Sequence, residues 1–162
     1  MSHRTSQTGP WALYQEDLNR EDFQHDAAQE NAVKHLQRLF DDFVNEKPQK
    51  KSVFGKLFGS KQNSREIQGL YFWGGVGRGK TYLVDTFYES LPTDRKLRIH
   101  FHRFMHKVHD EMNELKGVND PLKVVAKKFA ENTKIICFDE FFVSDITDAM
   151  ILGTLLDELF KL

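Results

Sequence analysis

The sequence has almost no cysteine, no long apolar run and almost no net charge, and each of these scarcities excludes a class of protein. Cys137 is the only cysteine among 162 residues, so an intramolecular disulfide is impossible and a reducing compartment is expected. No apolar run approaches the roughly 18 residues of a membrane span, and the N-terminus lacks the apolar segment of a signal peptide. A formal net charge of −1 gives no support to general binding of nucleic acid. We therefore expect a cytoplasmic globular protein.

The most informative segment is a glycine-rich loop that follows an apolar stretch. Residues 69–81 read Gly-Leu-Tyr-Phe-Trp-Gly-Gly-Val-Gly-Arg-Gly-Lys-Thr, which contains the phosphate-loop pattern G-x-x-x-x-G-K-[ST]. Glycines let backbone N–H groups surround an anion at the start of a helix, so a nucleoside triphosphate is expected to bind here. Lys80 would reach the β- and γ-phosphates, and the Thr81 hydroxyl would bind Mg²⁺. The predicted nucleotide-binding residues are Gly74, Gly75, Val76, Gly77, Arg78, Gly79, Lys80 and Thr81.

A pair of acids follows another apolar run. Residues 135–140 read Ile-Ile-Cys-Phe-Asp-Glu, as in a Walker B motif. Alone, such a run is more typical of a buried strand with exposed acids, but the phosphate loop favours a catalytic interpretation. We predict that Asp139 holds Mg²⁺, directly or through water, and that Glu140 polarises the attacking water, with Lys80 and Glu140 as catalytic residues. The next residues lack the x-x-Gly of a GTPase switch, so ATP is favoured over GTP.

The apolar periodicity indicates an α/β fold. Strands are expected within 69–73, 97–101 and 134–138, and helices over 27–44, about 80–91, 104–115, from 121 and from 146 to the end. Asp26, Asp120 and Asp145 are placed to cap three of these helices. This order predicts a phosphate-loop NTPase with a three-layer parallel sheet, in which Asp139 arrives beside the loop because parallel strands end at one edge. We divide the chain into a helical segment (1–46), a basic linker (47–66) and an incomplete ATPase core (67–162).

The basic linker permits two interpretations. From Lys47 to Arg65 it carries Lys50, Lys51, Lys56 and Lys61 and no acidic residue, with apolar residues between them. The favoured interpretation is a solvated loop that packs its few apolar residues on the domain. The alternative is weak contact of the 50–61 loop with a membrane surface or an acidic protein.

Three histidines, His102, His106 and His109, share one helix face if their helix begins early enough. A metal site is one interpretation, and a solvated polar face is the favoured one. We expect His102 to lie at the end of the second strand near Glu140. There it would hold the Glu140 carboxylate in an inactive position until a partner binds.

Three segments resemble a known family: residues 69–81, His100-Phe-His-Arg-Phe-Met105, and Cys137-Phe-Asp-Glu-Phe-Phe-Val-Ser-Asp-Ile-Thr-Asp-Ala149. They are similar to AAA+-type ATPases that include bacterial cell division ATPases and the mitochondrial lactation-elevated, or Afg-one-like, ATPases. The resemblance implies an AAA+-like fold, ATP and Mg²⁺ as cofactors, and a place in the cytoplasm with recruitment to the division site. It also implies association with the tubulin-like division protein FtsZ, whose polymers become less stable in the presence of ATP. Residues 26–29 would approach the adenine, unless they are an ordinary helix start.

Complete members of this family continue into further strands and an arginine that acts on a neighbouring subunit's ATP. We therefore expect a fragment or truncated product, which forms a homo-oligomer only if completed. The strand at 69–73 would lack neighbours, because the missing fourth strand lies between it and the strand of Asp139. The alternative function is a non-catalytic fragment that only binds partners. A helicase-loader-like ATPase on single-stranded DNA is disfavoured by the near-neutral charge.

Overall fold

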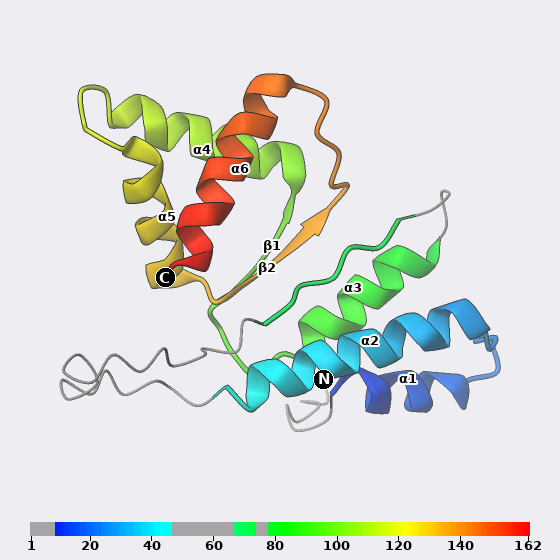
Figure 1. Ribbon diagram of the computed structural model, residues 1–162. Helices are drawn as coiled ribbons and strands as arrows, with labels where there is room; N and C mark the ends of the chain where they lie inside the picture. The colour runs from blue at the N-terminus through cyan, green and yellow to red at the C-terminus, as the bar shows by residue number, and fades with distance from the viewer. Residues whose placement is uncertain (1–8, 47–66, 74–77) are drawn as a thin grey trace, which may run out of the picture. The chain divides into compact units, whose positions relative to one another are not determined.

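The chain forms two compact units, Met1–Pro92 and Thr93–Leu162. The computed structural model describes residues 9–46, 67–73 and 78–162 (Figure 1). The basic linker expected at 47–66 and the loop residues Gly74, Gly75, Val76 and Gly77 lie outside the described residues. Within the described ranges, no helix has the length and apolar character needed to cross a membrane.

The described residues of the first unit form three helices that contact one another: α1 (Pro10–Leu18), α2 (Ala27–Val44) and α3 (Arg78–Ser90). The Asp26 carboxylate accepts hydrogen bonds from the backbone N–H groups of Ala28 and Gln29, at 2.7 and 3.1 Å, which confirms the predicted cap of α2. The apolar stripe of α2 is buried as its spacing predicts. The buried apolar side chains of this unit include Leu13, Tyr14, Val33, Leu36, Leu39, Phe40, Leu83, Phe87 and Leu91.

Helix α1 was not expected from the sequence. It begins at Pro10, a residue whose fixed φ suits the first helical position and whose missing N–H costs nothing there. Its nine residues are too few to be stable as an isolated helix, so tertiary contacts must hold it. One of these contacts is polar: the buried Asp17 carboxylate accepts a hydrogen bond from the Tyr82 hydroxyl of α3 at 2.8 Å.

The strand predicted within residues 69–73 is absent: residues 67–73 adopt no regular secondary structure. A strand exists by pairing with another strand, and no described strand pairs with this segment. Its side chains do not form a buried face either, because Tyr71 and Trp73 are 65% and 83% exposed. The apolar composition of this segment therefore does not make it a strand.

The second unit contains two parallel strands, β1 (Lys96–His100) and β2 (Ile135–Asp139), and three helices, α4 (Phe101–Glu114), α5 (Pro121–Asn132) and α6 (Ile146–Phe160). Both strands were predicted to within about a residue. The described part of the chain thus has an α/β arrangement with a two-stranded parallel sheet. The sequence analysis expected three strands in the sheet of a three-layer fold, so the described sheet has one strand fewer.

Helix starts in this unit differ from the predictions in two places. Helix α4 already begins at Phe101, so His102 lies in the helix and not at the end of a strand. Asp120 precedes α5 as expected, but it has a left-handed backbone with φ of 52° and its side chain makes no capping hydrogen bond. Asp145 caps α6 as predicted, by accepting hydrogen bonds from the backbone N–H groups of Thr147 and Asp148.

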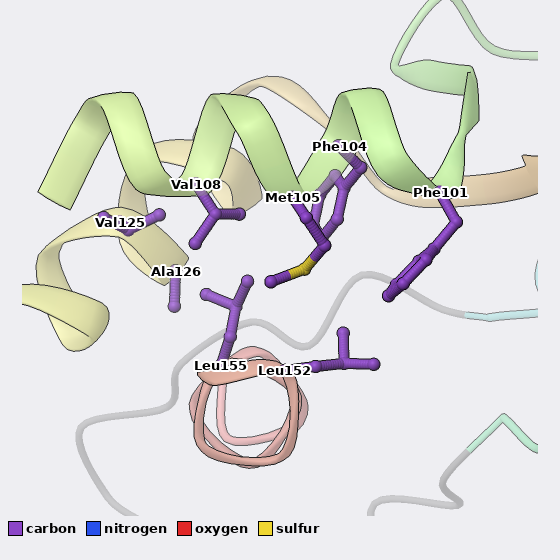
Figure 2. Packing of buried hydrophobic residues seen from close by; sticks show 8 residues of the cluster. All are labelled: Phe101, Phe104, Met105, Val108, Val125, Ala126, Leu152 and Leu155. Atoms are coloured by element: carbon purple, nitrogen blue, oxygen red, sulfur yellow. The ribbon is translucent and has the colours of Figure 1, made fainter. Parts of the chain in front are cut away.

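The core of the second unit lies between its three helices and one face of the sheet. Figure 2 shows side chains of α4 pointing towards α6, with residues of α5 beside them. The buried residues of this cluster are Phe101, Phe104, Met105, Val108, Val125, Ala126, Leu152 and Leu155. From the strands, Ile99, Ile136 and Phe138 pack against it. The sheet is therefore apolar on the face that meets the helices.

Candidate active site

The end of the predicted phosphate loop forms the first turn of α3. Gly79 and Lys80 are half-buried there and Thr81 is exposed. The first backbone N–H groups of a helix have no partner within the helix, so this turn offers donors to an anion. Gln29 of α2 lies beside it, since a Cβ at Gly79 would be 3.6 Å from Nε2 of Gln29. The segment expected near adenine thus lies close to the start of α3.

A partly buried hydrogen bond fixes the same helix to α1. Tyr82, which follows Thr81, donates its hydroxyl proton to Asp17. Burial raises the pKa of Tyr82, and the neighbouring Asp17 carboxylate raises it further, so the phenol stays neutral. Phe23 packs on the Tyr82 ring with centroids 5.1 Å apart. The sequence analysis did not single out this contact, because the two residues are 65 positions apart and no local pattern joins them.

The second group of predicted residues lies at the carboxyl end of the two strands. Arg98 is paired with Cys137 and His100 with Asp139 in the parallel register. Side chains alternate between the faces of a strand, so these four residues share the face opposite the apolar core. Cys137 is the buried member of this group, and burial raises the pKa of its thiol to about 11. Its predicted role as a small buried hydrophobe is confirmed.

Arg98 forms a bidentate ion pair with Asp139. The guanidinium Nε donates to Oδ2 of Asp139 at 2.8 Å and Nη2 donates to Oδ1 at 3.2 Å. The two side chains are 24% and 22% exposed. The sequence analysis did not single out Arg98. The alternation of β1 contained the signal, because it places Arg98 on the polar face of a strand next to that of Asp139.

Glu140 follows β2 with a left-handed backbone, φ 51°, which is uncommon for a residue other than glycine. Its side chain is 77% exposed, and its Oε2 lies 3.8 Å from Nδ1 of His100. That nitrogen is buried and has no hydrogen-bond partner within the described residues. The histidine beside Glu140 is therefore His100. The expectation that His102 lies at the end of the strand is wrong, because α4 begins one residue before it, at Phe101.

The three histidines of α4 do not form a metal site. His102 and His106 are exposed, and Nε2 of His109 lies 2.7 Å from Oδ1 of Asp148 in the first turn of α6. Nowhere in the described ranges do three or more histidine, cysteine or acidic side chains gather in a way that would hold a metal ion. The favoured interpretation of a polar face agrees with this arrangement.

The oxygen donors near β2 are of the kind that Mg²⁺ prefers. A carboxylate offers about four acceptor positions, and the two bonds from Arg98 leave the others of Asp139 for water on a cation. Lys80 and Thr81 lie in the first unit, whereas Asp139 and Glu140 lie together in the second. Asp139 by itself thus keeps acceptor positions that would hold a magnesium ion through water.

Comparisons with known proteins agree on one family. The family described as AFG1-like ATPase matches residues 8–162. The chain is 46% identical over 159 residues to a protein of Escherichia coli (strain K12) named "Cell division protein ZapE", covering 93% of this chain and 42% of that protein. It is 47% identical over 105 residues to "Lactation elevated protein 1 homolog B" of Danio rerio, covering 58% of this chain and 21% of that protein. The chain thus spans less than half the length of these relatives. No solved structure matches it.

Proposed function

Because this chain belongs to the AFG1-like ATPase family, we propose that it binds ATP with Mg²⁺ and hydrolyses it to ADP and phosphate. One observation carries the proposal: the same chain presents Lys80 and Thr81 on the first turn of a helix and Asp139 and Glu140 at the end of a parallel strand. These are the residue types that position phosphates, a divalent cation and an attacking water.

Each residue has a defined task in the proposed reaction. Backbone N–H groups of residues 74–81 hold the phosphates, and the Lys80 ammonium binds the β- and γ-phosphates. Thr81 and Asp139 would hold a magnesium ion, which would neutralise the charge that develops on the phosphates. Glu140 orients the attacking water and accepts its proton. Its large exposed fraction leaves this carboxylate open to water.

We further propose that the protein acts in cell division. The support is the name of the E. coli relative and the resemblance to ATPases that destabilise polymers of the division protein FtsZ. In this proposal the protein works in the cytoplasm at the division site, and ATP turnover drives its effect on FtsZ-type polymers. The alternative remains a chain that binds nucleotide or partners without turnover.

His100 takes the restraining role that the sequence analysis gave to His102. A modest rotation of either side chain would bring His100 and Glu140 from 3.8 Å to hydrogen-bond distance. In that position Glu140 is unable to orient water. We expect His100→Ala to change the rate of hydrolysis, while His102→Ala, on the exposed face of α4, leaves it unchanged. Equal effects of the two substitutions would contradict this role.

Hydrolysis of ATP by the purified 162-residue chain tests the main proposal. With Mg²⁺ we expect phosphate release that is lost in Lys80→Ala and in Glu140→Gln, while Glu140→Gln still binds a fluorescent ATP analogue. Lys116→Ala, an exposed lysine between α4 and α5, is the matched control and should retain the wild-type rate. Binding without phosphate release in the wild-type chain would favour the non-catalytic alternative.

The division role needs a separate measurement. FtsZ polymers are sedimented with the chain in the presence of ATP, of ADP or of no nucleotide. A smaller pellet with ATP alone is expected, and the loss should disappear with Lys80→Ala. An unchanged pellet under all conditions would remove FtsZ from the proposal and leave the ATPase proposal intact.

A further inference from the structure

Arg98 forms an ion pair with Asp139, the residue that holds the magnesium ion in the proposed ATPase reaction. Arg98 pairs in register with Cys137, yet its side chain reaches two residues further along β2 to bind both oxygens of Asp139. The contact therefore lies at the very end of the strand, next to Glu140. A guanidinium is always charged and matches the two oxygens of a carboxylate in a fixed geometry, which a lysine does not.

We infer that Arg98 is a positioning residue for the magnesium site: it orients Asp139 and cancels its charge, so that a divalent cation binds only together with nucleotide phosphates. This inference rests on the proposed function. Without Arg98, Asp139 and Glu140 would be two adjacent, partly exposed carboxylates that attract divalent cations by themselves. With Arg98, the local charge of the three side chains is −1 in place of −2, and Asp139 keeps one orientation.

A purely structural ion pair would behave differently. Removing such a pair at a position that is about a quarter exposed lowers the free energy of unfolding slightly, and it has no reason to change cation affinity. A positioning role instead predicts an altered balance between cation binding with and without nucleotide. The affinity for cation in the absence of nucleotide therefore separates the two roles.

The test is Mn²⁺ binding to the nucleotide-free chain, measured by electron paramagnetic resonance. In Arg98→Met, which keeps an apolar side chain of similar length, we expect Mn²⁺ to bind roughly tenfold more tightly than in the wild type. The gain should vanish in the double variant Arg98→Met with Asp139→Asn. Unchanged or weaker binding in a folded Arg98→Met chain, or a gain that survives Asp139→Asn, would overturn the inference.

Arg98→Lys provides the second variant if Arg98→Met does not fold. It keeps the charge and loses the two-pronged geometry, so Mn²⁺ affinity without nucleotide should rise less than about threefold. A larger rise in Mn²⁺ affinity would contradict the statement that Arg98 acts by cancelling the charge of Asp139. The Mn²⁺ measurement does not depend on turnover. If Arg98→Met binds Mn²⁺ tenfold more tightly but the chain never hydrolyses ATP, the proposed hydrolysis is wrong and the inference about Arg98 stands.

Discussion

The two units of the molecule support their candidate residues in different ways. The described side chains that are both buried and polar or charged all belong to the first unit; they are Asp17, Thr86 and Ser90. The cluster of buried side chains behind the strands of the second unit is apolar throughout. In the first unit a directional hydrogen bond ties the helix that begins at the phosphate loop to α1. In the second, nondirectional packing of aromatic and aliphatic groups supports the strands, and the ion pair of Arg98 with Asp139 lies on the opposite face of the sheet.

This difference predicts which kind of substitution should destabilise each unit most. Apolar packing loses free energy in proportion to the volume removed, whereas a buried hydrogen bond fails when a single atom is removed. The sequence also supplies separate reporters for the two units. Trp11, Trp73 and all four tyrosines lie in residues 1–92, and the only cysteine lies in the second unit. Tryptophan fluorescence therefore reports on the first unit, and alkylation of Cys137 reports on the second.

The largest effect is expected from Phe104→Ala. Phe104 is fully buried and its ring contacts those of Phe129 and Phe138, so its truncation should lower the free energy of unfolding of the second unit by about 3–5 kcal/mol. Urea unfolding followed by Cys137 alkylation measures it, with the 76%-exposed Phe142→Ala as control. If tryptophan fluorescence shifts to the same extent, the units unfold together and the contrast between them fails.

The reactivity of Cys137 gives the next largest effect. Burial raises its thiol pKa to about 11, compared with about 8.5 for an exposed thiol, so little thiolate is present at pH 8. We expect iodoacetamide to modify the native chain at least roughly a hundred times more slowly than the urea-unfolded chain. Mass spectrometry over time measures both rates. Similar rates would mean that the second unit opens readily and lacks the tight core described above.

Tyr82→Phe tests the first unit. The substitution removes the donor to the buried Asp17 carboxylate and should lower the free energy of unfolding by about 1–3 kcal/mol. The Tyr82 pKa is raised in the folded state, so the hydroxyl contributes fully below the unfolded pKa of about 10 and loses its contribution as pH rises above it. The difference between wild type and variant, measured by tryptophan fluorescence in urea, should therefore shrink above about pH 10. A difference that grows with pH would contradict this assignment.

The smallest effect is expected at the surface of the second unit. His109 and Asp148 join α4 to α6, but their side chains are 40% and 30% exposed. His109→Ala should lower the free energy of unfolding by less than about 1 kcal/mol. His106→Ala, on the exposed side of the same helix, is the control. A loss comparable to that of Tyr82→Phe would show that the second unit also depends on a polar contact.

Local patterns predicted most of the regular structure. The spacing of apolar residues located α2, α4, α6 and both strands, and Asp26 and Asp145 cap helices as their positions indicated. These predictions succeeded because periodicity and capping are properties of a few neighbouring residues. Helix α1 was missed because its stability comes from tertiary contacts, and the segment at 67–73 was misjudged because a strand requires a partner.

The candidate site was predictable to a smaller extent. The motifs identified Asp139 and Glu140, and the structure places them at the end of a strand as expected. Which side chains face them depended on the register between β1 and β2, and no single-strand pattern contains that information. The sequence placed His102 at the end of β1, whereas β1 ends at His100 and His102 lies in the first turn of α4. Arg98 was overlooked although the alternation of β1 places it on the polar face of that strand.

The alternation of β1 has a consequence for how this segment tolerates insertion and deletion. Arg98 and His100 point away from the core only because Leu97 and Ile99 occupy the other positions of the strand. Losing or gaining one residue within Lys96–His100 would turn the polar pair into the hydrophobic layer and the aliphatic pair out of it. A substitution in this strand changes one side chain and keeps the alternation of the others. A change of its length by one residue would instead remove both the packing of the strand on the core and the contact of Arg98 with Asp139.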